Sequence, residues 1–142
     1  MPWSRRAITL SACLLAAHAQ AGPRLDYTLN CMGCHGVEGM GAPPEIPQLK
    51  DRMGYYLQVD GGRSYLVQVP GSRQSALSDA ALAEVLNWML ERFAGESRPA
   101  ALEPYSADEV SRLRASPPND VAAVRRTLEH AIAAAHPAGY SN

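Results

Sequence analysis

Residues 30–36 read NCMGCHG, so two cysteines stand three positions apart and a histidine follows the second one directly. A C-x-x-C pair serves three chemistries in proteins: a redox dithiol, half of a zinc site, or the covalent attachment of haem. In C-x-x-C-H, the thiols of Cys31 and Cys34 can form thioethers with the two vinyl groups of haem. The imidazole of His35 can then bind the iron as an axial ligand. The motif therefore predicts one covalently bound haem c.

The two other chemistries find little support elsewhere in the chain. A redox dithiol usually lies near a βαβ pattern, and the sequence contains no such pattern. A zinc site needs about four ligands. Two of the remaining candidate ligands, Cys13 and His18, fall in a segment that we expect to be removed. The other two, His130 and His136, lie far along the chain from the cysteine pair. Haem attachment therefore remains the preferred interpretation.

The N-terminus predicts a secretory signal peptide over residues 1–21. Two arginines, Arg5 and Arg6, precede a short apolar run over residues 7–17, and small residues follow at cleavage-site spacing. The run is too short to span a bilayer, and it continues past Cys13, so we expect no lipid anchor at that cysteine. Export would place the protein in the periplasm. Removing the segment leaves 11 Lys+Arg against 14 Asp+Glu, which gives no sign of nucleic-acid binding.

The middle of the chain predicts short elements around the motif. Residues 25–34 favour a short helix that runs into the cysteines, and residues 36–47 contain three glycines and three prolines, which predict a loop. We expect one or two helical turns over residues 48–59 and a turn at residues 60–62. Residues 63–69, RSYLVQV, favour extended chain because they include an aromatic residue and two β-branched residues, Tyr65, Val67 and Val69.

Residues 77–95, LSDAALAEVLNWMLERFAG, give the clearest helix pattern. Apolar residues recur at the spacing of a single helical face: Leu82, Val85, Leu86, Met89, Leu90 and Phe93. Ser78 is placed to cap the N-terminus of this helix, and Gly95 is placed to end it. This segment predicts a long amphipathic helix.

The tail, residues 98–142, predicts two further helices. Ser106 and Glu109 have the spacing of a capping box, which predicts a short helix to about residue 114. Asp120 can cap a second helix whose apolar face ends before His136. The sequence therefore predicts an all-α protein with three parts: a signal peptide (1–21), a haem domain (22–97) and a two-helix C-terminal extension (98–142).

Taken together, residues 25–93 resemble the cytochrome c family, in which a helix leads into CxxCH, a Gly/Pro loop follows, and an amphipathic helix comes last. The resemblance implies a small all-α fold in which the first and last helices cross, with Leu29 packed against Trp88 and its neighbours. It also implies that two residues of the IPQL segment, residues 46–49, help to hold the haem. Pro47 would accept a hydrogen bond from the imidazole of His35 through its carbonyl, and Leu49 would follow at the matching position.

The resemblance does not extend to the sixth iron ligand, opposite His35. The family usually supplies a methionine followed by proline shortly before the last helix, but this chain has Val69 there. Met53 is the first candidate for the sixth ligand. The alternatives are an open site or, with less support, four other side chains: Met40, Met89, His130 and His136. Arg63 is a candidate partner for a haem propionate, because buried carboxylates need hydrogen-bond donors.

The resemblance implies a periplasmic electron carrier rather than an enzyme. Single electrons would pass from a periplasmic dehydrogenase to an acceptor such as an oxidase or another cytochrome. The absence of a methionine at position 69 keeps an alternative open: a five-coordinate haem protein that binds small ligands, acts as a sensor or has weak peroxidase activity. A third interpretation is a haem subunit of a larger redox complex, attached through its tail.

Overall fold

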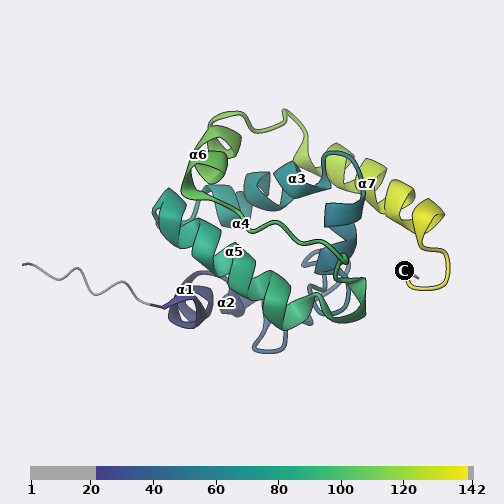
Figure 1. Cartoon of the computed structure of the whole chain (residues 1–142), viewed down its shortest axis with the longest axis horizontal. Helices are drawn as coiled ribbons and strands as arrows, with labels where there is room; N and C mark the ends of the chain where they lie inside the picture. The colour runs from purple at the N-terminus through teal and green to yellow at the C-terminus, as the bar shows by residue number, and fades with distance from the viewer. Residues whose placement is uncertain (1–21, 141–142) are drawn as a thin grey trace, which may run out of the picture.

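The computed structural model of the chain describes residues 22–140, which fold into helices joined by short loops (Figure 1). Within that range the only β pairing is an isolated antiparallel bridge between Ala42 and Ile46. The predicted all-α fold is therefore confirmed. The predicted signal peptide, including Cys13, lies outside the described residues. Over residues 22–140, none of the helices combines the length and the apolar character that crossing a membrane requires.

The C-x-x-C-H motif begins at Cys31, which lies between helix α1 (Pro23–Asn30) and the single turn α2 (Met32–His35). Proline at the first position of α1 suits a helix start, because its fixed φ is helical and its missing N–H has no partner there. The prediction that Leu29 packs against Trp88 is wrong, because the Leu29 side chain is 71% exposed. Tyr27 is turned inward instead, and its ring lies 5.3 Å from that of Trp88.

After the glycine/proline loop come the 3₁₀ helix η1 (Met53–Gln58) and the α-helix α3 (Gly62–Gln68). The prediction of extended chain over residues 63–69 is therefore wrong. The helix starts at paired glycines, and a Cβ on Gly62 would collide with the carbonyl of Tyr56, so only glycine allows this close approach. Helix formation also buries Tyr65, Leu66 and Val67. This burial outweighs a β propensity that spans only about 1 kcal/mol.

The short helix α4 (Pro70–Arg73) leads to the long helix α5 (Asp79–Phe93). As predicted, the Ser78 hydroxyl accepts a hydrogen bond from the backbone N–H of Ala81, which caps α5. Gly95 follows the last turn with a φ of 50° and begins the 3₁₀ helix η2 (Gly95–Ser97). Helix α5 buries seven side chains: Leu82, Ala83, Val85, Leu86, Met89, Leu90 and Phe93. At about 1.5–3 kcal/mol for each large side chain, this face is a major source of stability.

The C-terminal extension forms the two predicted helices, α6 (Ala107–Ala115) and α7 (Val121–Ala135). Their N-caps are the predicted ones: Ser106 accepts from the N–H of Glu109, and Asp120 accepts from the N–H of Ala123. The capping box is incomplete, however, because the Glu109 carboxylate binds the Arg63 guanidinium rather than returning to the cap.

The extension packs on residues 22–97, which we call the haem-motif half of the chain. Helix α6 contacts α3 and α5, and α7 contacts α3 and η1, while α1 packs on a different part of α5 (Figure 1). Val110 of α6 and two residues of α7, Leu128 and Ile132, join the same buried cluster as the α5 face. The described residues therefore share one hydrophobic core to which the extension contributes.

One arginine of the extension fixes the connection between α3 and α5. The guanidinium of Arg114 donates hydrogen bonds to the carbonyls of Ser72, Ser75 and Leu77 at 2.8–3.2 Å. It also contacts the Ser75 hydroxyl and pairs with the Asp79 carboxylate at 2.9 Å. These contacts tie α6 to the whole segment that precedes α5.

Replacing Arg114 by methionine should lower the free energy of unfolding by about 2–3 kcal/mol, because it leaves three carbonyls without their charged donor. Arg112→Met is the matched control, since Arg112 is exposed on the same helix, and it should change stability by less than about 0.5 kcal/mol. Denaturant unfolding followed by circular dichroism measures both. Equal losses in the two variants would contradict the anchoring role of Arg114.

Candidate functional site

The three motif residues lie on one turn of the chain. Cys31 interrupts the helix with φ −125° and ψ −37°, and α2 starts directly after it. The backbone N–H groups of Cys34 and His35 both donate to the Cys31 carbonyl, at 3.2 and 3.0 Å. Residues at i, i+3 and i+4 share one face of such a turn. Neither thiol forms a disulfide; Cys31 is partly buried and Cys34 is exposed. Both sulfurs are thus available for attachment on the side where the imidazole lies.

The geometry argues against the redox-dithiol and zinc interpretations. Burial raises the pKa of the Cys31 thiol to about 11, and the nearby acidic groups Asp26 and Cys34 add to this. A redox dithiol needs a lowered pKa to supply a reactive thiolate. Among residues 22–140, no three side chains of the metal-binding types His, Cys, Asp and Glu come together. The cysteines therefore have no ligand set around them that would complete a zinc site.

The His35 ring is oriented by a backbone carbonyl. Its Nδ1 lies 3.1 Å from the carbonyl oxygen of Pro47. A carbonyl can only accept, so Nδ1 carries the proton and Nε2 keeps its lone pair. Burial lowers the pKa of the imidazole, and the bond to Pro47 partly opposes this. His35 thus presents a neutral, oriented imidazole, which is the form that binds a metal. The predicted contact between His35 and Pro47 is present.

A compact loop brings Pro47 to His35. The N–H of Gly41 donates to the His35 carbonyl at 2.9 Å, and Ala42 and Ile46 exchange two backbone hydrogen bonds of 3.0 Å each. Pro47 follows this bridge directly. The next anchor is Leu49, whose N–H donates to the Gly39 carbonyl at 2.7 Å and whose side chain is buried.

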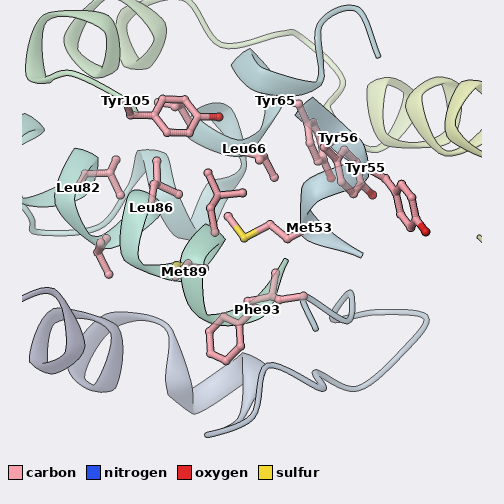
Figure 2. Close-up of a cluster of buried hydrophobic side chains, with 14 of the residues drawn as sticks. Met53, Tyr55, Tyr56, Tyr65, Leu66, Leu82, Leu86, Met89, Phe93 and Tyr105 are labelled. Carbon is pink, nitrogen blue, oxygen red and sulfur yellow. The ribbon is translucent and has the colours of Figure 1, made fainter. Parts of the chain in front are cut away.

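Met53 lies at the start of η1 and is buried, with 2% of its surface exposed. Its N–H donates to the carbonyl of Leu49. Figure 2 shows its side chain reaching into the buried cluster that also contains Leu66 of α3 and Met89 of α5. The thioether is therefore in the apolar interior, one short segment along the chain from Pro47.

Arg63 of α3 binds the C-terminal extension. Its guanidinium binds both carboxylate oxygens of Glu109, at 2.6 and 2.7 Å, and the carbonyls of Glu103 and Pro104. It also lies 4.1 Å from the centre of the Tyr105 ring. The Arg63 guanidinium holds the pKa of the Glu109 carboxyl below its usual value. Arg63 thus joins α3 to the extension through these contacts.

Sequence reasoning missed Tyr27 and Arg125. The Tyr27 hydroxyl donates to the carbonyl of Gly36, 2.5 Å away, directly after the motif, and its ring packs on Trp88 and Phe93. The eight-residue helix α1 is too short for periodicity to identify Tyr27 as the buried position. Arg125 of α7 donates to the carbonyl of Pro44, 81 residues earlier, and no local pattern signals such a contact.

Gly41→Ala should lower the free energy of unfolding by about 2 kcal/mol. Gly41 has a φ of 61°, and a Cβ there would lie 2.6 Å from the Pro47 oxygen that His35 contacts. Gly71→Ala is the control, because a Cβ at Gly71 meets nothing within 4 Å. Denaturant unfolding measures stability, and exchange of the His35 Nδ1 proton in NMR spectra measures the local effect. Wild-type values for both in the Gly41 variant would contradict the close packing of this loop.

Comparison with known proteins agrees with this site. The sequence profile of the family described as Cytochrome c matches residues 19–92. One cytochrome c-552 from Thermus thermophilus is 32% identical over 143 aligned positions, which cover 84% of this chain and 96% of the relative. Another cytochrome c-552 from Thermus thermophilus is 30% identical, over 69% of this chain and 90% of the relative.

The first of these matches reaches beyond the haem-motif half of the chain. A match confined to residues 1–97 could cover only about two thirds of the chain, so the likeness includes part of the extension. Members of this family carry covalently bound haem c, and the single C-x-x-C-H motif provides for one. The chain belongs to the cytochrome c family and is a c-type cytochrome, an electron carrier.

Proposed function

We propose that the protein is an exported monohaem cytochrome that carries single electrons in the periplasm, from a dehydrogenase to an oxidase or another cytochrome. The observation that carries the proposal is the hydrogen bond from His35 to the Pro47 carbonyl, with the unpaired Cys34 directly before His35 and the unpaired Cys31 one helical turn before it. This arrangement presents two thiols and one neutral imidazole on a single short segment, which is the donor set that haem c needs.

In this proposal each side chain of the site has a distinct role. The thiols of Cys31 and Cys34 would hold the haem as thioethers, each by addition across one vinyl group with the S–H hydrogen passing to the neighbouring carbon, so no oxidant would be needed. His35 would bind the iron through Nε2, the Pro47 carbonyl would fix the ring through Nδ1, and Leu49 would supply apolar packing. The haem supplies a one-electron couple, while the chain supplies ligation, burial and a surface for partners.

The attachment is tested by expressing the full chain in a host that attaches haem c. The wild-type protein should gain the mass of one haem and show a Soret band that remains after acid–acetone extraction. In a Cys31→Ala/Cys34→Ala variant the haem should become extractable. In His35→Ala the low-spin spectrum should be lost, because the axial imidazole is missing. Normal low-spin haem in His35→Ala would contradict the assignment of this ligand.

We further propose Met53 as the sixth ligand. The segment between α3 and α5, residues 69–78, contains no methionine, histidine, cysteine or lysine. The Met40 side chain is half exposed, and Met89 lies on the buried face of α5. His136 packs on the ring of Tyr55. Met53 combines a buried thioether with a position on the segment that carries Pro47, and thioether ligation raises the reduction potential.

Met53→Leu should abolish the weak band near the red edge of the oxidised spectrum and lower the reduction potential, because leucine keeps the volume but removes the sulfur. Met89→Leu is the matched control and should keep both properties. An optical spectrum and a redox titration measure them. An unchanged band in Met53→Leu would remove this residue from the iron.

One observation favours a second function, a five-coordinate haem that binds small ligands. It is the absence of any usual iron ligand in residues 69–78, where the family has its methionine. Binding of carbon monoxide distinguishes an open sixth position from ligation by Met53. If the sixth position is open, the reduced protein binds it rapidly and without ligand displacement, whereas binding to a Met53-ligated iron is slow. The electron-carrier role itself is tested by whether a periplasmic dehydrogenase reduces the protein at a catalytic rate.

A further inference from the structure

Helix α7 of the extension reaches the loop that orients His35. The Nη1 group of Arg125 donates to the carbonyl of Pro44 at 3.1 Å. Its Nε group pairs with the Glu129 carboxylate at 2.7 Å, one helical turn further along α7. The Tyr56 hydroxyl of η1 contacts the same carboxylate at 3.4 Å. The Nε group of Arg125 is therefore held by Glu129, which Tyr56 of η1 also contacts, while the Nη1 group binds the loop.

Pro44 and Pro47 belong to the same tight loop, so a displacement of Pro44 also displaces Pro47. The two hydrogen bonds between Ala42 and Ile46 close a tight loop with Pro44 inside it. Pro47 follows Ile46 immediately, so its carbonyl direction depends on how this loop sits. On the other side, Gly41 lies so close to the Pro47 oxygen that a Cβ would be only 2.6 Å away. The loop thus behaves as one packed unit rather than as independent residues.

A cavity of about 580 Å³ separates this loop from α7 and η1. Its lining comes from the loop, from η1 and the turn before it, from α7 and from the C-terminal end: Pro43, Pro44, Pro47, Gln48, Arg52, Tyr56, Arg125, Glu129 and Tyr140. Arg125 and Pro44 both line this cavity, and the hydrogen bond between them joins α7 directly to the loop.

We propose that Arg125 is a positioning residue that keeps the Pro47 carbonyl on the imidazole N–H of His35 and thereby lowers the reduction potential of the haem. The inference rests on the proposed role of His35 as iron ligand. A carbonyl that accepts the Nδ1 proton makes the imidazole a stronger donor to the metal. A stronger donor favours the oxidised, more positive iron. Loosening the loop weakens the bond and should raise the potential.

The direction in which the reduction potential changes after loss of Arg125 distinguishes a positioning role from a purely electrostatic one. Arg125 carries a positive charge, and removing a positive charge near a redox centre favours its oxidised state. A purely electrostatic effect of losing Arg125 is therefore a lower potential. Loss of the positioning effect gives a higher one. The neighbouring Arg126 has the same charge, is exposed and lies on the same helix, so it provides the electrostatic reference.

The experiment compares Arg125→Gln with Arg126→Gln and the wild type, all as full-length holoprotein. The reduction potential should rise in Arg125→Gln and should stay constant or fall in Arg126→Gln. Exchange of the His35 Nδ1 proton, followed by NMR in the reduced, diamagnetic state, should become about tenfold faster only in Arg125→Gln, the factor expected for one net hydrogen bond. Arg125→Lys keeps the charge and one donor, and should give smaller changes in the same directions.

Three outcomes overturn the inference: a potential that falls in Arg125→Gln, one that shifts equally in both glutamine variants, or unchanged proton exchange. If Arg125→Gln does not accumulate as holoprotein, Arg125→Lys decides by the same two measurements. A failure of the proposed function looks different, because the wild-type protein itself would then lack covalent haem or a His35 ligand.

Discussion

The hydrogen bond between the His35 imidazole and the Pro47 carbonyl is the constraint around which the rest of the site is arranged. It fixes the tautomer and the plane of the ring, and so it decides which nitrogen faces the cofactor. A loop of glycines and prolines carries the carbonyl to the ring, and its shape allows no Cβ at Gly41. The motif supplies the reactive groups, but this loop sets the direction in which the imidazole acts.

Three arginine contacts make the extension part of the same body. Arg63 binds Glu109 of α6, Arg114 binds the segment before α5, and Arg125 binds the loop at Pro44. Each joins residues at least 35 positions apart in sequence. Partly exposed ion pairs contribute little by themselves, but these guanidinium groups also satisfy backbone carbonyls in loops. They therefore hold loops in place more than they add to the core.

The sequence was sufficient for features that depend on local chemistry. The caps at Ser78, Ser106 and Asp120 follow from spacing along the chain, and the resemblance to the cytochrome c family implied the contact of His35 with Pro47. It was insufficient where tertiary contacts decide. Residues 63–68 are helical because burial in the shared core, where α3 contacts α6 and α7 of the extension, outweighs their β propensity. Arg63 binds Glu109, a partner 46 positions away that no pattern marks. Tyr27 packs on Trp88 in place of the predicted Leu29, because one short helix has too few residues to define a face.

The contact between Arg125 and Pro44 has a consequence for the order in which the chain matures. During synthesis the cysteines emerge before α7, so the loop beside them lacks the restraint from Arg125 until that helix has been made. Until then the segment that carries the two thiols is held only by its own local hydrogen bonds. The C-terminal helix therefore completes the environment of a motif that is made much earlier.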